Sequence, residues 1–168
     1  GTASITPVGK FASAASFDGT SHAVVNGVPA RLVGLTDYSV SLWFKSNSVA
    51  GTQVLAEAAE TATGTRAFRI SIVGGTITFN LGSATFNGPQ VQPGEWHHLV
   101  LVRSNSNVLG YLDQTAIITS SSGLLSSITF SPNSMNLGAD TSTANYFNGT
   151  IDEVAIWNRA LGASEISA

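Results

Sequence analysis

Acidic side chains are few in this chain of 168 residues, and their spacing decides whether it could hydrolyse a glycosidic bond. Such hydrolysis needs two carboxylates held about 5 to 9.5 Å apart, and the chain has only 10 acidic residues. Glu57 and Glu60 are separated by two alanines, and Asp152 and Glu153 are adjacent, so on a regular strand they face opposite ways. Because there is also no Gly-x-Ser-x-Gly turn and no cysteine, the sequence predicts a domain that is not an enzyme.

The histidines are few as well, and two of them are neighbours. His97 and His98 lie in an expected strand, where consecutive side chains point to opposite faces of the sheet. The pair therefore does not chelate one metal ion, and His22 is far away in the sequence. We expect one of the pair to be buried and hydrogen-bonded and the other to be exposed, with Trp96 closing the edge of the core.

Side chains that bind sugars are more abundant than side chains that cleave them. An aromatic ring stacks on the C–H face of a sugar, while amide and hydroxyl groups bind its hydroxyls. The apolar alternation around Trp43 places this residue with Ser41 and Lys45 on the face away from the core, which we expect to be the concave face. Packing under a covering loop is the alternative for Trp43, and turn formation is the alternative for the asparagines. The predicted glycan-binding residues are Trp43, Lys45, Phe86, Asn87, Asn145 and Tyr146, the last four on loops.

Strands must position these residues, because no long helical stripe is present. Short β-rich runs separated by turn residues are typical of an all-β sandwich or barrel. Gly74-Gly75 and the run 104–107 predict hairpin turns, and Ser164 is the expected N-cap of a short C-terminal helix. The predicted strands are Ser16–Phe17, His22–Val25, Tyr38–Lys45, Gln53–Glu57, Ala67–Val73, Thr76–Leu81, Trp96–Arg103, Val108–Asp113, Ala116–Thr119, Ile128–Phe130, Ser134–Leu137 and Gly149–Trp157.

Composition limits the partners of the chain. Only 10% of residues are charged, the net charge is −3, and no basic cluster is present, which argues against nucleic acid and against an anionic membrane surface. No apolar run approaches the roughly 20 residues of a membrane span, so membrane insertion is not expected. The length predicts one domain over residues 1–168. The chain starts at Gly1 and not at Met, so we expect a processed protein or a piece of a longer one.

Four segments occur in a fixed order along the chain. They are Ser16-Phe-Asp-Gly-Thr, Tyr38-Ser-Val-Ser-Leu-Trp-Phe-Lys, Gly94-Glu-Trp-His-His-Leu-Val-Leu-Val-Arg followed by Gly110-Tyr-Leu-Asp, and Leu137-Gly-Ala-Asp followed by Tyr146-Phe-Asn-Gly-Thr-Ile-Asp-Glu-Val-Ala-Ile-Trp-Asn-Arg-Ala-Leu and Ser164-Glu-Ile. In this order they resemble the laminin G-like branch of the concanavalin A-like jelly rolls. The resemblance implies a jelly-roll β-sandwich of two antiparallel sheets over the whole chain. Glucanases of this superfamily place their carboxylates as Glu-x-Asp-x-x-Glu, a motif that is absent here. Gln114 stands where the family usually has glycine, which questions the geometry of that hairpin turn.

The resemblance also implies a structural calcium ion. Relatives often hold Ca²⁺ where the first and last strands are neighbours, with oxygens from both strands, and Asp18 and Asp152 occupy those places here. Ca²⁺ prefers carboxylate and carbonyl oxygens. The alternative is that Asp18 caps a turn and that Asp152 pairs with a cation such as Arg159. Asp140 is a further candidate ligand in a loop.

The apolar pattern of the last predicted strand changes phase at Asp152. Phe147 and Ile151 share one face, whereas Val154 and Ile156 have the opposite parity. Such a change fits a β-bulge, which turns a carbonyl group out of the ladder, and it equally fits a strand that is buried on both faces.

These features together predict a non-catalytic binding module for a glycan or cell-surface polymer, stabilised by one Ca²⁺. The low Lys and Glu content and the many Ser, Thr and Asn residues favour an extracellular, cell-surface or virion location. The alternative is a structural or assembly protein, such as a virion decoration or fibre domain or an adhesin module. Such a protein would work through self-association or other protein contacts, with the apolar stretch Ile117–Phe130 as its contact patch.

Overall fold

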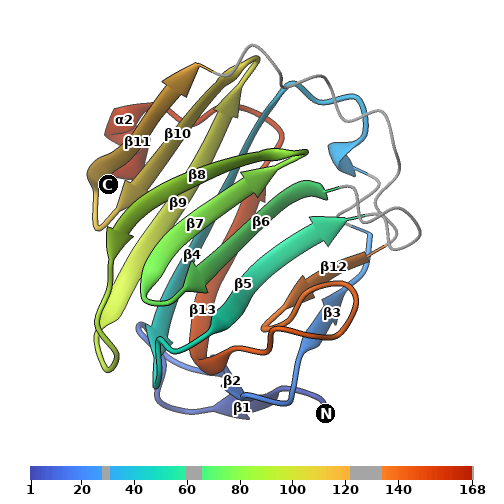
Figure 1. Ribbon diagram of the computed structural model, residues 1–168, viewed down its shortest axis with the longest axis vertical. Coiled ribbons are helices and arrows are strands. Elements are labelled where there is room, and N and C mark those ends of the chain that lie inside the picture. Colours follow the sequence, from blue (N-terminus) through green and yellow to red (C-terminus); the bar gives the residue numbers. More distant parts are fainter. Residues whose placement is uncertain (28–30, 60–65, 122–133, 168) are drawn as a thin grey trace.

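The computed structural model describes residues 1–27, 31–59, 66–121 and 134–167, which form two antiparallel β-sheets packed face to face (Figure 1). The predicted jelly-roll β-sandwich is confirmed. The larger sheet has seven strands, which lie in the spatial order β1 (Ser4–Thr6), β2 (Ala14–Asp18), β13 (Asn148–Trp157), β4 (Asp37–Ser46), β9 (Trp96–Ser104), β10 (Asn107–Leu112) and β11 (Thr115–Ser121).

The smaller sheet has six strands. A four-residue helix, α2 (Ala163–Ile166), follows the last strand of the larger sheet. The six strands lie in the order β3 (Ala23–Val25), β12 (Ser134–Leu137), β5 (Thr52–Ala59), β6 (Arg66–Val73), β7 (Thr76–Leu81) and β8 (Ala84–Gln90).

Alternating apolar residues on the facing sides of the two sheets form one core. On β4, Val40, Leu42 and Phe44 are fully buried, and on β7 Ile77 and Phe79 are fully buried against them in the same cluster. The intervening residues of both strands point to the outer faces, because the side-chain period of a strand is two. A ligand that binds to a sheet would therefore contact side chains of the outer faces.

Every predicted strand that falls within the described residues is confirmed, and the structure has two strands that were not predicted. Ile128–Phe130 lies outside the described residues. β1 and β8 were not predicted, because both are sheet edges without an apolar alternation. β8 contains Gly88 and Pro89, which an edge strand tolerates. A Cβ atom on Gly88 would come within 2.8 Å of Ile117 Cδ1, so the glycine allows β8 to approach the other sheet.

The predicted hairpin turns are confirmed, and their backbone conformations explain the residues found there. Gly74 and Gly75 join β6 to β7 with φ angles of 54° and 87°, and Asn105 joins β9 to β10 with φ of 54°. The turn between β10 and β11 keeps the left-handed conformation at Asp113 (φ 49°) and at Gln114 (φ 69°), although neither residue is glycine. The hairpin therefore retains its geometry at the cost of backbone strain.

The last strand, β13, contains the bulge that its apolar pattern indicated. The pairing of β13 with β4 shifts between Asp152 and Ala155, and Glu153 has a left-handed φ of 48°. After this shift Val154 and Ile156 pack against the main core. The bulge, and not burial of both faces, explains the change of parity.

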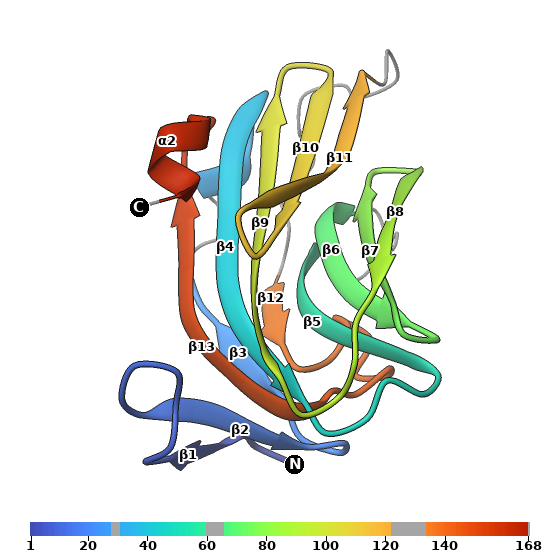
Figure 2. The ribbon, with the colours of Figure 1, turned by 90° about the vertical axis from the view of Figure 1, so that its left-hand side faces the viewer.

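The two outer faces differ in shape. Figure 2 shows both sheets bent in the same sense, so that the outer face of the six-stranded sheet is hollow and that of the seven-stranded sheet is bowed outward. Part of the bowed face is covered by α2, whose Ile166 packs with Val100 and Val102 in a second apolar cluster. α2 starts after Gly162 as N-cap, so the prediction of Ser164 was wrong. The Glu165 side chain instead accepts a hydrogen bond from the Gly162 N–H (2.9 Å).

Candidate functional site

A groove of about 510 Å³ crosses the hollow outer face of the six-stranded sheet. Hydroxyl and amide side chains predominate among its described lining residues, and none of these residues is aromatic. The groove contains one charged residue of this set and one aliphatic residue. It is lined by Thr52, Arg69, Ser71, Val73, Thr76, Thr78, Asn80, Thr85 and Asn87.

Regular strand pairing positions these polar side chains. Ser71 lies opposite Thr78, and Asn80 lies opposite Thr85, so they form rows across β6, β7 and β8. The Asn80 amide donates a hydrogen bond to Thr85 Oγ1 (2.8 Å), and the Thr78 hydroxyl donates one to Asn87 Oδ1 (3.3 Å). Because the groups are fixed by strands and by each other, binding a ligand would cost little ordering of side chains.

A buried ionic network forms the end of the groove at β5. Glu57 is only 1% exposed, and its Oε1 accepts hydrogen bonds from Arg66 Nε (2.6 Å) and Arg69 Nε (2.7 Å). Its Oε2 accepts hydrogen bonds from the backbone N–H (2.7 Å) and the hydroxyl (3.1 Å) of Thr141. Glu57 therefore joins the sheet to the loop between β12 and β13, which lies in front of β5 and β12 in Figure 1.

Asp140 fixes that loop in the same way. Its Oδ1 accepts hydrogen bonds from the Ser142 hydroxyl (2.7 Å) and the Ala144 N–H (2.8 Å), and its Oδ2 accepts one from the Asn145 amide (2.7 Å). Burial acts to raise the pKa of Asp140, but these hydrogen bonds and the nearby Arg69 hold it below its ordinary value. Asp140 is thus ionised at neutral pH, and hydrogen-bond donors, which repel a cation, occupy both of its oxygens.

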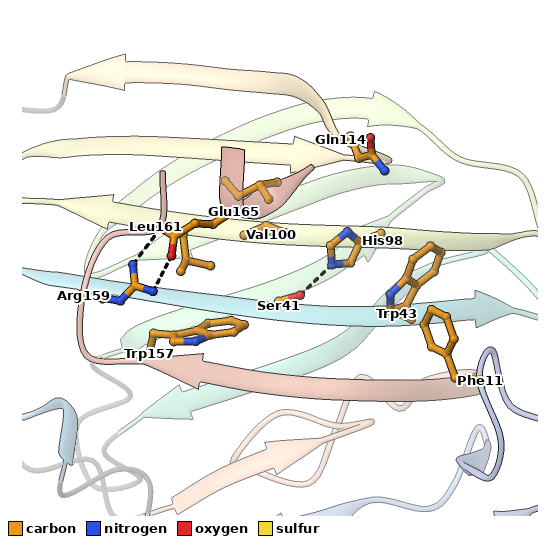
Figure 3. Close-up of a pocket in the computed structure, with 11 residues that line it drawn as sticks. Phe11, Ser41, Trp43, His98, Val100, Gln114, Trp157, Arg159, Leu161 and Glu165 are labelled. Atoms are coloured by element: carbon orange, nitrogen blue, oxygen red, sulfur yellow. Dashed lines mark hydrogen bonds and ion pairs between the residues drawn. The ribbon is translucent and has the colours of Figure 1, made fainter. Parts of the chain in front are cut away.

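The bowed face carries a second, aromatic pocket of about 390 Å³ (Figure 3). Ser41 and Val100 lie on its floor, and Arg159 pairs with Glu165 at one side through distances of 2.6 and 2.8 Å. The described lining residues are Phe11, Ser41, Trp43, His98, Val100, Gln114, Trp157, Arg159, Leu161, Glu165 and Ile166.

Trp43 is enclosed on this face by three neighbours. His98 stacks on its ring with centroids 4.9 Å apart, and Phe11 meets it edge-on at 5.7 Å. Lys10 Nζ lies 4.3 Å from the ring centroid. This geometry corresponds to packing under a covering loop and leaves Trp43 poorly placed to stack on a sugar. Lys45 lies opposite Trp96 on the same sheet, so the prediction that Trp43 and Lys45 occupy the concave face was wrong.

Asp152 holds the covering loop in place. Its Oδ2 accepts hydrogen bonds from the Lys10 N–H (2.8 Å) and the Phe11 N–H (3.3 Å), and its Oδ1 accepts one from the Glu153 N–H (2.9 Å). Gly9 is required beneath it, because a Cβ atom there would come within 2.6 Å of Asp152 Oδ2. The alternative to calcium, in which Asp152 pairs with a cation such as Arg159, was wrong for Arg159, because Arg159 binds Glu165.

The two predicted calcium ligands do not meet. Asp18 lies opposite Asn148 in the β2–β13 ladder, whereas Asp152 is four residues further along β13, about 13 Å away at the rise of a strand. Asp18 Oδ1 instead accepts hydrogen bonds from the N–H and hydroxyl of Thr20, both at 2.9 Å. Hydrogen bonds from Ser21 and Thr20 lower the pKa of Asp18 to about 2. The prediction of a calcium site shared by Asp18 and Asp152 was therefore wrong. The carboxylate oxygens of Asp140 and Asp152 accept hydrogen bonds from N–H and O–H groups, and such surroundings do not fit a cation.

The two adjacent histidines point to opposite faces, as expected, but both are partly buried and both have partners. His97 Nδ1 lies 2.8 Å from Asp113 Oδ2, and His98 Nε2 lies 2.7 Å from Ser41 Oγ. Burial lowers the pKa of His98, and the charge of Asp113 opposes that shift. The prediction of one exposed histidine was therefore wrong. Trp96 lies on the outer face and does not close the core edge.

The other predicted ligand residues are divided among three places. Phe86 lies opposite Phe79 and packs toward the core, so its prediction as an exposed platform was wrong. Asn87 lines the groove, whereas Asn145 is not among its lining residues and donates its amide to Asp140 in the loop between β12 and β13. Tyr146 packs near the His22 ring, at a centroid distance of 6.2 Å.

The polar residues of β7 were overlooked, although the sequence carries their signal. In Thr-Ile-Thr-Phe-Asn-Leu every second residue is polar, and Thr76, Thr78 and Asn80 point into the groove. The contact patch predicted at Ile117–Phe130 lies mostly outside the described residues. Its described members Ile117 and Ile118 pack against the core.

No cluster of three or more His, Asp or Glu side chains that could hold a metal ion occurs in the described ranges. Among the same residues, no helix has the length and apolar character needed to cross a membrane. Of the pair Glu57 and Glu60, which the sequence did not favour as catalytic, Glu60 lies outside the described ranges and Glu57 accepts hydrogen bonds from two arginines.

Comparison with known structures finds the same fold in carbohydrate-binding domains. Domain 4 of AbnA, an extracellular GH43 arabinanase from Geobacillus stearothermophilus solved with arabinotriose, is 25% identical, with a TM-score of 0.78 over 99% of this chain and 80% of that one. The CBM40 of the Ruminococcus gnavus IT-sialidase, bound to α2,3 sialyllactose, is 16% identical, with a TM-score of 0.79 over 92% and 94%. The NanB sialidase of Streptococcus pneumoniae (K499G mutant) has the same score and identity over 92% of this chain but only 27% of that one.

Comparison with curated protein sequences finds no significant match. A laminin G-type family model, described as the concanavalin A-like lectin/glucanases superfamily, matches residues 17–167. This match includes the four segments that suggested the resemblance. The chain therefore belongs to the concanavalin A-like lectin/glucanases superfamily.

Proposed function

We propose that this domain is a non-catalytic carbohydrate-binding module that holds a glycan in the groove of the six-stranded sheet. The observation that carries the proposal is the row of outward hydroxyl and amide groups on β7 and β8, where Thr76 and Asn80 are partly exposed and Thr85 and Asn87 are exposed. Sugar hydroxyls both donate and accept hydrogen bonds, and Ser, Thr and Asn side chains do the same. A hollow face with such groups at every second residue is complementary to a glycan lying on the sheet.

The aromatic pocket is the weaker candidate because its most prominent ring is already packed. Stacking on Trp43 would require a sugar to displace His98, Phe11 or Lys10, and Phe11 is held through its backbone by Asp152. The groove requires no such displacement. The exposed Thr85 and Asn87 can exchange water for the incoming ligand without moving a packed ring.

Catalysis is not part of the proposal, because the carboxylates nearest the groove are occupied. Glu57 accepts hydrogen bonds from two arginines and from Thr141, and Asp140 accepts them from Ser142, Ala144 and Asn145. A general acid or nucleophile must face the scissile bond of the substrate. These side chains face the protein.

The structural neighbours support this proposal. They include a domain bound to arabinotriose and a module bound to sialyllactose, both parts of carbohydrate-active enzymes. By analogy we place this domain outside the cell, attached to a larger protein or displayed in several copies. A groove that binds mainly through hydrogen bonds gives a weak single site, and several copies would raise the avidity.

Titration calorimetry with a panel of soluble polysaccharides tests the proposal. We expect at least one glycan class to bind, and the double substitution Asn80→Ala with Asn87→Ala to weaken it about 10-fold to 100-fold, from about 0.5–1.5 kcal/mol for each lost hydrogen bond. Asn107→Ala is the matched control, because Asn107 is an exposed asparagine on a strand of the other sheet. Equal affinity of the double variant and the control would move the site away from the groove, and a panel without any binding would overturn the function.

A further inference from the structure

The electrostatic state of the groove limits which glycans it can take. Arg69 is the one ionised side chain among the described residues that line it. Its Nε donates to Glu57 Oε1 (2.7 Å), and its Nη2 lies 3.5 Å from Asp140 Oδ2. The guanidinium is therefore already directed at two carboxylates of the protein.

The charges beneath this end of the groove cancel. Arg66 and Arg69 supply two positive charges, and Glu57 and Asp140 supply two negative ones, linked through distances of 2.6 to 3.5 Å. Glu57 is 1% exposed and Asp140 is 3% exposed, so water screens these two carboxylates weakly, whereas the Arg66 side chain is 32% exposed. An arriving ligand meets a balanced network and not an unpaired cation.

An anionic sugar would gain little from such a site. Its carboxylate or sulfate group loses water on binding, and that loss is repaid only where a counter-charge replaces the water. Arg69 can offer that charge only by weakening its bonds to Glu57 and Asp140. The net charge of −3 adds a long-range field that opposes an anion.

A neutral sugar meets suitable partners along the same groove. Thr76 and Asn80 on β7 and Thr85 and Asn87 on β8 present partly or fully exposed hydroxyl and amide groups, and the buried Ser71 and Thr78 lie beneath them. The groove runs from β5 to β8, three strand spacings or about 14 Å. This length suits a short stretch of oligosaccharide lying across the strands and exceeds a single ring.

We infer that the groove selects neutral oligosaccharides and rejects acidic ones, which are the glycans that carry sialic acid, uronic acid or sulfate. The inference rests on the proposed function, since it names the class of ligand for the same site. Of the two ligands seen in the structural neighbours, arabinotriose is uncharged and sialyllactose carries a carboxylate, so the groove should accept a ligand of the first kind and reject one of the second.

The first experiment compares the wild-type domain against neutral and acidic ligands at 20 mM and 300 mM salt. The neutral set is arabinan, galactan, linear xylooligosaccharides without uronic acid and β-glucan; the acidic set is sialyllactose, polygalacturonate and heparan sulfate. We expect binding within the neutral set that is independent of salt, and none within the acidic set. Binding of an acidic ligand that weakens with salt would overturn the inference and leave the proposed function standing. Absence of all binding would overturn both.

The second experiment releases the arginines from their partner. Glu57→Gln leaves one positive charge in excess beside the groove, so affinity for acidic polysaccharides should rise about fivefold to tenfold at low salt and fall back at high salt. Glu95→Gln, at an exposed position in another loop, makes the same change in net charge and should give no gain. If circular dichroism shows that Glu57→Gln does not fold, Asp140→Asn is used in its place, because it also removes one carboxylate of the network. An equal response of the network variant and the control would show that charge balance at Arg69 does not set the selectivity.

Discussion

The two outer faces of this sandwich are built from the same kind of strand but have opposite uses. The bowed face of the seven-stranded sheet carries Trp43, whose ring contacts His98 and is partly covered by the loop of Lys10 and Phe11, with Phe11 itself 65% exposed. The hollow face of the six-stranded sheet carries ordinary threonines and asparagines, and its groove is open. A tryptophan on an outer face can therefore be structural, while the threonines and asparagines of the other face form the candidate site.

Physical chemistry explains the division between the faces. A large aromatic side chain on an outer face exposes apolar surface, which is costly unless another element covers it. Here Lys10 and Phe11 provide that cover, and Asp152 secures it through backbone hydrogen bonds. Hydroxyl and amide groups need no such cover, because water satisfies them until a ligand arrives.

The largest expected effect is on the stability of the bowed face. Trp43→Ala removes a ring that contacts His98, Phe11 and Lys10, and we expect a loss of about 2–3 kcal/mol, or about 5–10 °C in Tm. Glycan affinity per folded molecule should stay unchanged. Thermal unfolding combined with calorimetric titration checks both statements, and a loss of affinity with intact stability would return the site to Trp43.

A smaller effect is expected from the residue that anchors the covering loop. Asp152→Asn replaces an oxygen that accepts hydrogen bonds from two backbone N–H groups, and we expect a loss of about 1–2 kcal/mol. Because donors surround this carboxylate, EDTA should leave the Tm and the glycan affinity of the wild type unchanged. A Tm that falls with EDTA in the wild type but not in Asp152→Asn would place a metal at Asp152.

The sequence predicts the fold well and the site only in part. Apolar alternation and the four motif segments were sufficient to predict the β-sandwich, because a strand with one face on the core has an apolar residue at every second position. The bulge at Asp152 was also readable as a change of parity. Edge strands such as β8 were missed, since an edge has little apolar pattern to show.

The site was harder because its location depends on which face is covered. Alternation correctly placed Trp43 on the face away from the core, but nothing in the sequence shows that Lys10 and Phe11, from the loop between β1 and β2, lie against its ring. The polar alternation of Thr76, Thr78 and Asn80 was visible, yet it becomes a groove only when β6 and β8 are set beside it.

The two faces should also differ in their response to pH. Burial lowers the pKa of His98 from 6.5, so the folded protein binds this proton less well than the unfolded chain does. Stability contributed by neutral His98 is therefore present above pH 6.5 and is lost as the pH falls toward the lowered pKa. We expect less than about 1 kcal/mol, because the ring is partly solvated.

Urea unfolding at pH 7.5 and pH 5.5 measures this loss, and His98→Gln should reduce the difference between the two values. Glycan affinity should be equal at both pH values, because none of the described groove residues is a histidine. An affinity that follows the His98 titration would contradict the separation of the two faces.

The smallest effect is expected at the hairpin turn next to the aromatic pocket. Gln114 has a left-handed φ of 69°, a conformation that costs a non-glycine residue about 1–2 kcal/mol, part of which glycine returns as unfolded-state entropy. Gln114→Gly should raise the free energy of unfolding by about 0.5 kcal/mol without changing glycan affinity. Chemical denaturation of the two proteins measures it, and a destabilised variant would show that the Gln114 side chain contributes contacts worth more than the strain.

Mapping the bound glycan by amide chemical shifts tests the central claim most directly. Titration of the ¹⁵N-labelled domain with the best ligand of the neutral panel should shift amide signals of β6, β7 and β8, around Ser71, Thr78 and Asn87, and leave those around Trp43 and His98 in place. Shifts confined to Trp43, His98 and α2 would contradict the account and assign ligand binding to the bowed face.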